Sequence, residues 1–347
     1  MPHRSAIGTM TVSLHQRLPY FSMCALAVVR NDASPSDVMQ SLRDRVGTIA
    51  RLIPQGRPVV YLDYPVHMNI GDLLIEQGAE RFLEEAGYNV VDWRSAHDFC
   101  DCARAKVPAD ATIILHGGGN FGDLYDLHQP FRERVIEAFP RHRIVMLPQT
   151  IYFQSPERLR RAVEIFSRHD NLTVCVRDYA SLEFFRHHFQ NPVHLMPDMA
   201  HCLWNAAAPP PEAGDARRTL LFARTDKESR PMDGLPADTS APTDWQDVVA
   251  PYEILAFRAL RKLHYKHCVF GGGRSLHTAW RPVRDRLILK GRRLIEGYDV
   301  VITNRLHAAI LGLLLRREVV MMDNSNGKLS EYYATWFKDL TAARFAH

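Results

Sequence analysis

An arginine and a histidine, Arg305 and His307, follow directly after an apolar run in the C-terminal part of the sequence. The run at residues 300–303 is typical of a buried strand, and the apolar residues after His307 predict a helix that begins beside these two side chains. Positive charges are unfavourable at a helix N-terminus because of the helix dipole, unless an anion shares the site. The pair therefore predicts an anion-binding site, with plain solvated charges as the alternative.

Three consecutive glycines mark a second candidate site. Gly117, Gly118 and Gly119 follow a predicted strand, so their bare backbone lets a ligand approach closely, and Asn120 completes the candidate segment. The pattern matches neither the dinucleotide fingerprint G-x-G-x-x-G nor a phosphate-binding P-loop, so nucleotide binding of either kind is not supported. The preceding His116 is a candidate proton donor or anion contact, or else a hydrogen-bonded packing residue.

Two shorter motifs at the ends of other predicted strands add candidate binding groups. In the segment Asn69-Ile70-Gly71-Asp72, the glycine permits close approach and a new helix offers unpaired N–H groups to an anion. A plain capped turn is the alternative for that segment. Arg177 could clamp a carboxylate or phosphate with its planar guanidinium, unless it only pairs with the neighbouring aspartate at the surface.

Short apolar runs rich in branched residues alternate with helical patterns along most of the chain. Strands are predicted at residues 59–62, 111–115, 143–147, 173–176, 219–223, 267–270, 300–303 and 319–322. Helices are predicted at residues 35–54, 72–86, 156–169, 252–263, 281–296, 307–315 and 330–338. This alternation indicates parallel sheets, in which ligands bind at the carboxyl ends of the strands. The motifs above all lie at such ends.

The fold class expected from these patterns is α/β, with two Rossmann-like domains that face a cleft. A loosely ordered leader (1–34), with a cleaved signal peptide as the alternative, precedes an N-terminal domain (35–205). A linker rich in proline and alanine (206–217) then leads to a C-terminal domain (218–347). Residues 226–245 combine several prolines with polar residues, which predicts a loop or mobile flap.

Composition places the chain among soluble globular proteins, with 46% hydrophobic and 24% charged residues. A net charge of +4 is no nucleic-acid footprint, and it suits an anionic substrate or an anionic membrane surface equally well. The six cysteines form no C-x-x-C pair, so we expect reduced thiols in a cytoplasm and neither a disulfide framework nor a zinc site. No apolar run is long enough to span a bilayer. A basic run in the predicted helix 281–296 is either a solvated face or a membrane-docking surface.

Taken in order, the motifs resemble those of the polysaccharide pyruvyl transferase family, over roughly residues 58–338. The resemblance is carried by an Asn-x-Gly-Asp turn, a glycine-rich strand end, an Arg-Asp pair and an Arg-Leu-His segment, at residues 69–72, 116–120, 177–178 and 305–307. It implies a glycosyltransferase-B-like fold and a reaction that moves the enolpyruvyl group of phosphoenolpyruvate onto two hydroxyls of a sugar. The product would be a pyruvate ketal on an exopolysaccharide or its lipid-linked repeat unit, with release of phosphate.

The resemblance also implies donor-binding positions at Arg177, Arg305, Leu306 and His307, and a less direct counterpart at His116. In such a reaction His307 is the candidate acid, because an imidazolium beside a bound dianion is stabilised. His116 or Asp72 is the candidate base, and the roles could be reversed. The chemistry requires no metal and no cofactor beyond phosphoenolpyruvate as donor.

Two other functions fit the same patterns, because a fold does not fix a function. The first is a glycosyltransferase that uses a nucleotide sugar, and the second is a carbohydrate-binding relative without catalytic activity. For pyruvyl transfer, the expected partners are phosphoenolpyruvate and a saccharide acceptor, either free or lipid-linked. The expected location is the cytoplasm, including the inner face of the cytoplasmic membrane.

Overall fold

The computed structural model describes residues 34–209, 217–224, 239–269, 275–323 and 327–346. The predicted leader up to residue 33, most of the predicted linker and most of the 226–245 segment lie outside the described residues. From residue 33 onward, the chain forms one unit by its internal contacts.

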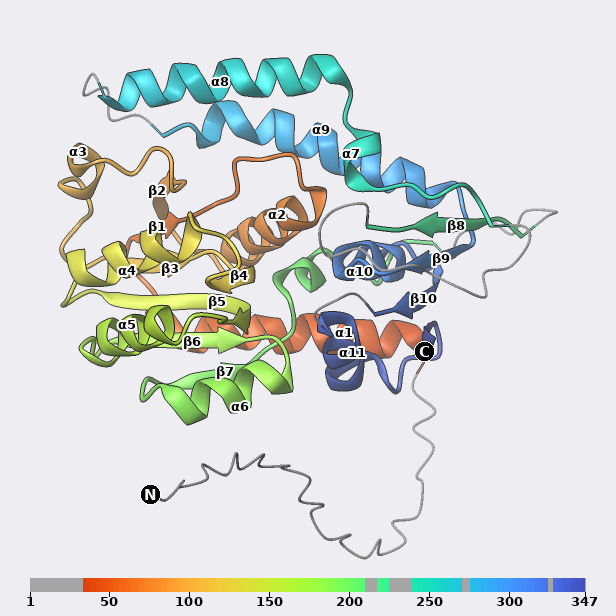
Figure 1. The fold of residues 1–347 in the computed structure, drawn as a ribbon, viewed down its shortest axis with the longest axis horizontal. Helices are drawn as coiled ribbons and strands as arrows, with labels where there is room; N and C mark the ends of the chain where they lie inside the picture. The colour runs from red at the N-terminus through yellow and green to blue at the C-terminus, as the bar shows by residue number, and fades with distance from the viewer. Residues whose placement is uncertain (1–33, 210–216, 225–238, 270–274, 324–326, 347) are drawn as a thin grey trace, which may run out of the picture. The chain divides into compact units, whose positions relative to one another are not determined.

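The described N-terminal part contains a seven-stranded parallel sheet with the order β2-β1-β3-β5-β6-β7, in which β4 also pairs with β5 (Figure 1). Its strands are β1 (Val59–Leu62), β2 (Val90–Arg94), β3 (Thr112–Leu115), β4 (Gly118–Gly122), β5 (Arg143–Tyr152), β6 (Leu172–Val176) and β7 (Val193–Leu195). Every residue of β1, β3 and β6 is buried. Burial on both faces explains why these strands appear in the sequence as continuous apolar runs.

A smaller parallel sheet of four strands follows in the described C-terminal part, with the order β11-β10-β9-β8. Its strands are β8 (Thr219–Phe222), β9 (Val300–Thr303), β10 (Glu318–Met322) and β11 (Ala343–Ala346). The parallel sheets and their intervening helices confirm an α/β fold.

Helices connect the strands of both sheets (Figure 1). They are α1 (Pro35–Gly47), α2 (Ile70–Glu85), α3 (Asp101–Arg104), α4 (His128–Ala138), α5 (Pro156–Ser167), α6 (Tyr179–His188), α7 (Trp245–Val248), α8 (Pro251–Val269), α9 (His277–Glu296), α10 (Leu306–Leu314) and α11 (Lys328–Tyr332). Three short helical turns complete the set, at Thr48–Leu52 (η1), Met199–Leu203 (η2) and Tyr333–Phe337 (η3).

One hydrophobic core includes side chains from both sheets and from the two helices that begin at the site motifs. Leu73 and Leu74 of α2 belong to the same cluster as Phe222 of β8 and Ala308 of α10. These side chains are fully buried. The shared core therefore holds the N-termini of α2 and α10 in fixed positions.

The basic run of α9 is largely paired with acidic side chains. Arg284 is buried and forms ion pairs with Glu76 and Glu80 of α2, at 2.9 and 2.5 Å. Lys290 pairs with Glu253 at 2.6 Å. Both predicted interpretations of this run, a solvated face and a membrane-docking surface, are therefore wrong for Arg284, which joins α9 to α2 in the interior.

Two predictions about local structure are wrong. The strand expected at 267–270 does not form, because α8 continues as a helix to Val269. A short apolar run cannot be assigned to strand or helix by periodicity alone.

Cys100 and Cys102 form a disulfide, although the sequence predicted reduced thiols, whereas Cys175 and Cys202 are buried and free.

In the portion of the chain that the structure describes, no helix combines the length and apolar character required to cross a bilayer.

Candidate functional site

A cavity of about 360 Å³ lies where strands of both sheets end. Gly119 and Asn120 of β4 and Arg177 after β6 contribute from the larger sheet. Arg224 after β8 and Arg305 after β9 contribute from the smaller sheet. The remaining lining residues are His67, Asn69, Asp72, Tyr125, His128, Trp245, Leu306, His307, Lys328 and Leu329.

Arg305 occupies the N-cap position of α10, and its charge is balanced by a carboxylate of the protein. Its Nη2 donates to Oδ2 of Asp244 at 2.6 Å, and its Nε pairs with Oδ1 of the same residue. Asp244 is buried and caps α7. The positive charge at this helix start thus has its counter-ion within the protein. Its position alone therefore does not indicate a bound anion, as the sequence interpretation assumed, and the charge is not simply solvated either.

Asp198 joins Arg177 of one half of the cavity to His307 of the other. Its Oδ2 accepts from Nη1 of Arg177 at 2.6 Å and lies 3.3 Å from Nε2 of His307. Burial alone would raise the pKa of Asp198, but His307 and Arg177 hold that pKa well below its usual range. Asp198 is therefore a buried, ionised carboxylate that orients both side chains.

Arg177 is almost fully buried, so the alternative of a surface pair with its neighbour is wrong. Its Nε donates to Oγ1 of Thr150 at 2.8 Å, while Nη1 binds Asp198. Nη2 faces Gly119, where an added Cβ would lie 3.0 Å from that nitrogen. Asp178 instead caps α6 by accepting from the backbone N–H of Ser181. The guanidinium is thus fixed on two sides and reaches the cavity wall with its remaining nitrogen.

The Asn-Ile-Gly-Asp turn is a helix cap and a part of the cavity wall at the same time. Asn69 caps α2 by accepting from the backbone N–H of Gly71 at 3.2 Å, and its amide donates to Asp72 at 2.8 Å. Asn69 and Asp72 line the cavity, but Gly71 does not. A Cβ added at Gly71 would meet Nδ1 of His307 at 2.9 Å. The missing side chain of Gly71 therefore leaves the space that the ring of His307, from the start of α10, occupies.

The glycine run has a packing role that its sequence did not reveal. A Cβ on Gly117 would lie 2.9 Å from the backbone oxygen of Pro148, and Gly118 has a φ of +120°. Neither residue lines the cavity, whereas Gly119 and Asn120 do. The backbone is thus open to the cavity only at Gly119 and Asn120, because Gly117 and Gly118 pack in the interior.

His116 does not line the cavity, although the sequence offered it as a catalytic candidate. Its side chain is buried, and Nδ1 lies 2.7 Å from the hydroxyl of Tyr61. Burial lowers the pKa of His116 to about 3, so the imidazole is neutral near pH 7. The geometry favours the alternative of a hydrogen-bonded packing residue.

Two histidines that the sequence prediction omitted, His67 and His128, do line the cavity. Nε2 of His67 lies 3.5 Å from Oδ2 of Asp72, and burial lowers the pKa of His67 despite that carboxylate. Burial would raise the pKa of Asp72, but His67 and His307 hold it below its usual value. His128 pairs with the buried Asp63 at 2.9 Å. At neutral pH the cavity therefore offers a neutral imidazole beside an ionised carboxylate.

The other lining residues that the prediction missed, among them Trp245 and Lys328, lacked a strong sequence signal. Trp245 follows Asp244 at the start of α7. An acidic residue before an apolar one indicates the start of a helix, but it does not indicate a binding site. Lys328 begins α11 after a glycine with φ of +64°. Among the described residues, no cluster of three or more histidine, cysteine, aspartate or glutamate side chains could hold a metal ion.

The structure has two parallel sheets, and a cavity lined mostly by polar side chains lies at the carboxyl ends of their strands. This is the place where open α/β folds bind their ligands. Residues 69–326 match the model of the polysaccharide pyruvyl transferase family, which covers most of the chain. The chain belongs to this family, and it is a transferase.

Several known proteins and solved structures are similar to the chain, among them two relatives and one crystal structure. "Putative pyruvyl transferase EpsO" of Bacillus subtilis (strain 168) is 35% identical over 307 residues, which are 88% of this chain and 94% of EpsO. "Pyruvyl transferase 1" of Schizosaccharomyces pombe is 28% identical over 298 residues, or 82% of this chain and 71% of that protein. The crystal structure of an uncharacterized Klebsiella pneumoniae protein has a TM-score of 0.55 at 19% identity, covering 88% of this chain and 98% of that one. This last likeness supports the fold alone.

Replacing Gly71 with alanine should displace His307 and lower transferase turnover by about tenfold to a hundredfold, because small shifts of a reacting group are costly. Turnover and thermal unfolding of the variant would be compared with those of Gly47→Ala, where an added Cβ meets nothing within 4 Å. Equal turnover in the two variants would mean that the position of His307 has no bearing on the reaction.

Proposed function

We propose that the protein transfers the enolpyruvyl group of phosphoenolpyruvate to two hydroxyls of one sugar residue, in an exopolysaccharide or its lipid-linked repeat unit. The observation that carries the proposal is the convergence of Arg177, Arg305 and His307 on one cavity, at the N-termini of α2 and α10. Phosphoenolpyruvate has a carboxylate and a phosphate, so it needs several cationic and N–H donors in one place.

In the proposed complex, the donor lies between the two halves of the cavity. Arg177 and Arg305 bind the anionic groups, with Leu306 packed beside them. Asn69, Gly119 and Asn120 contact the substrates, while Gly71, Gly117 and Gly118 shape the wall from behind. Asp198 and Asp244 keep both arginines oriented when no donor is bound.

The proposed reaction balances without a cofactor. A proton is added to the methylene carbon C3 of the donor, which leaves an oxocarbenium-like centre at C2. One sugar hydroxyl forms a bond to C2 and loses its proton to a base. The bond between C2 and the phosphate oxygen then breaks, and the second hydroxyl attacks C2 to close the ketal. The second hydroxyl proton leaves with phosphate.

His307 is the proposed acid, and Asp198 holds its ring through Nε2. Asp72 is the proposed base, either directly or through His67. A neutral imidazole held by a carboxylate is suited to accept a hydroxyl proton. His116 is not part of this scheme, because it lies buried against Tyr61.

The proposal includes a glycosyltransferase-B-like arrangement of two domains, residues 35–205 and 218–347, with residues 206–217 as the linker. The site between them would open to the cytoplasm, where phosphoenolpyruvate is available. A lipid-linked acceptor would be met at the inner face of the cytoplasmic membrane.

Phosphoenolpyruvate should raise the apparent thermal stability of the protein, because a ligand that binds only the native state stabilises it. At a concentration of a hundred times the dissociation constant, the gain is about 2.7 kcal/mol. Thermal unfolding would be followed with phosphoenolpyruvate, with inorganic phosphate and with nucleotide sugars. Stabilisation by a nucleotide sugar but not by phosphoenolpyruvate would contradict the proposal and favour a glycosyltransferase.

A further inference from the structure

Helix α8 presents large apolar side chains to solvent on its outer face. Its inner side is fixed by Glu253 and Phe257, which are both buried. The exposed large side chains are Tyr252 at 57%, Leu255 at 65%, Leu263 at 67% and Tyr265 at 65% exposure. Tyr252 is contacted by α9, since its hydroxyl accepts from Nη2 of Arg286 at 2.8 Å. Single exposed apolar residues are ordinary, but the remaining three on one helix form a surface that needs an explanation.

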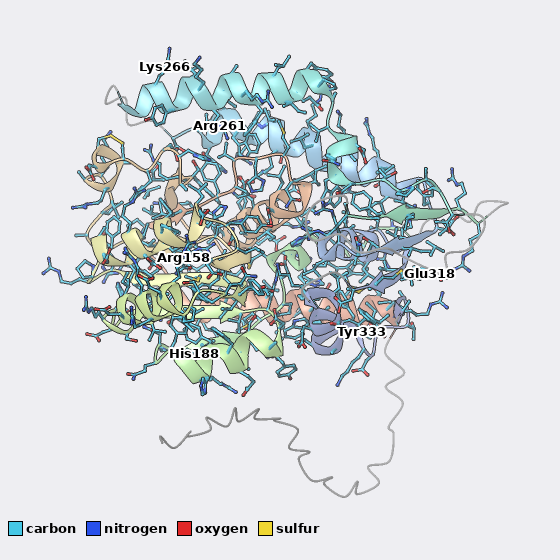
Figure 2. The ribbon with its side chains drawn as sticks, in the orientation of Figure 1. Arg158, His188, Arg261, Lys266, Glu318 and Tyr333 are labelled. Carbon is cyan, nitrogen blue, oxygen red and sulfur yellow. A yellow bond between two sulfur atoms is a disulfide. The ribbon has the colours of Figure 1, made fainter. Side chains whose placement is uncertain are left out.

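Exposed basic residues are interleaved with these apolar side chains. They are Arg258, Arg261, Lys262 and Lys266, of which Arg261 lies over the ring of the inner Phe257 and the other three remain for the outer face. Figure 2 shows Lys266 near the far end of α8, on the outer side of the helix. The helix has one acidic residue, Glu253, which is buried and paired with Lys290 at 2.6 Å. The outer face therefore combines apolar and positively charged groups and carries no carboxylate.

A helix with leucines, aromatic rings and basic residues on its exposed face has the chemistry of an interfacial membrane helix. Lysine and arginine can bury their aliphatic stems along apolar surface while their charges reach the headgroups. Each such charge near an anionic bilayer also adds electrostatic attraction. A nucleic acid would use the charges but leave both exposed leucines in water, so an anionic bilayer is the better match.

We propose that the outer face of α8 docks the protein on an anionic lipid bilayer. Leu255 and Leu263 enter the interface, and Lys262 and Lys266 contact headgroup phosphates. Helix α7, whose Trp245 lines the cavity, directly precedes α8 in the chain, so docking would tie one wall of the cavity to the membrane surface. This inference goes beyond pyruvyl transfer and does not depend on the identity of the donor.

The test is binding of the purified full chain to phosphatidylcholine vesicles with and without phosphatidylglycerol, measured by flotation. We expect binding only to the anionic vesicles. The charge reversals Lys262→Glu and Lys266→Glu together should weaken it by about tenfold or more. The pair Leu255→Ser and Leu263→Ser should weaken it as well, because buried apolar area contributes to binding. Thermal unfolding of each variant would verify that it is folded.

The matched control is the double variant Arg141→Glu and Arg160→Glu, which changes the net charge equally at exposed residues outside α8. An equal loss of binding in this control would overturn the proposal, because attraction would then depend on net charge alone. Failure of the folded wild-type protein to bind anionic vesicles would overturn it too, and would leave a protein partner as the occupant of this face. Vesicle binding needs neither donor nor acceptor, so this proposal and the proposed function can fail separately.

Discussion

Substituting His307 with glutamine should lower turnover by about a hundredfold or more, because general acid catalysis contributes rate factors of this size. Glutamine keeps a polar side chain of similar length beside Asp198, yet it cannot deliver a proton. The main loss should be in kcat, with a smaller change in the KM for phosphoenolpyruvate. Steady-state phosphate release from donor plus acceptor measures both quantities.

The matched control is His187→Gln, a histidine on the exposed part of α6. It should keep normal turnover, and both variants should unfold at about the wild-type temperature. Near-normal kcat in folded His307→Gln would remove this residue from the proposed mechanism and leave the acid to another group in the cavity.

Replacing Asp198 with asparagine should destabilise the protein by about 3 kcal/mol or more, because it leaves the buried charge of Arg177 uncompensated. Turnover should also decrease, since Arg177 and His307 lose the group that orients them. Denaturant unfolding gives the stability change. Asp126→Asn is the control, because Asp126 is 85% exposed in its pair with Arg158, and such pairs contribute little.

The contribution of Asp198 to the free energy of unfolding should decrease as the pH is lowered. The partners His307 and Arg177 lower its pKa in the folded protein, so the carboxylate adds stability above its unfolded pKa of about 3.9. That stability is lost as the pH falls below about 4. The difference in unfolding free energy between wild type and Asp198→Asn should therefore shrink at acidic pH. A constant difference across that range would contradict the ionised, paired state of this carboxylate.

Periodicity predicts the central strands and the longest helices, but α4 and α6 are not among the predicted helices. The strands β1, β3 and β6 are buried on both faces, so their sequences are nearly continuous apolar runs. The sequence does not predict β4, because its glycines, which pack against neighbouring backbone, are typical of a loop. The apolar end of α8 resembles a strand in the sequence, because the run at residues 267–270 is too short for its periodicity to distinguish strand from helix.

Within the site, position along a strand was more informative than residue type. Asn69, Asp72, Arg177, Arg305 and His307 all line the cavity, as their places after strands suggested. Asp198 follows β7, which lies beside the strand that precedes Arg177, so its place in the sequence puts it at the same edge of the sheet. Asp244 has no comparable signal, because its segment approaches Arg305 only in the folded chain. The place of His116 beside the glycines makes it a candidate in the sequence, but its ring contacts Tyr61 in the interior.

The most direct test of the central claim is to incubate the purified protein with phosphoenolpyruvate and candidate oligosaccharides and to analyse the products by mass spectrometry. The proposal predicts an oligosaccharide that gains one pyruvyl ketal while one equivalent of phosphate is released, and that product should be missing with His307→Gln. Transfer of a sugar from a nucleotide donor by the same preparation, without any pyruvylated product, would contradict it.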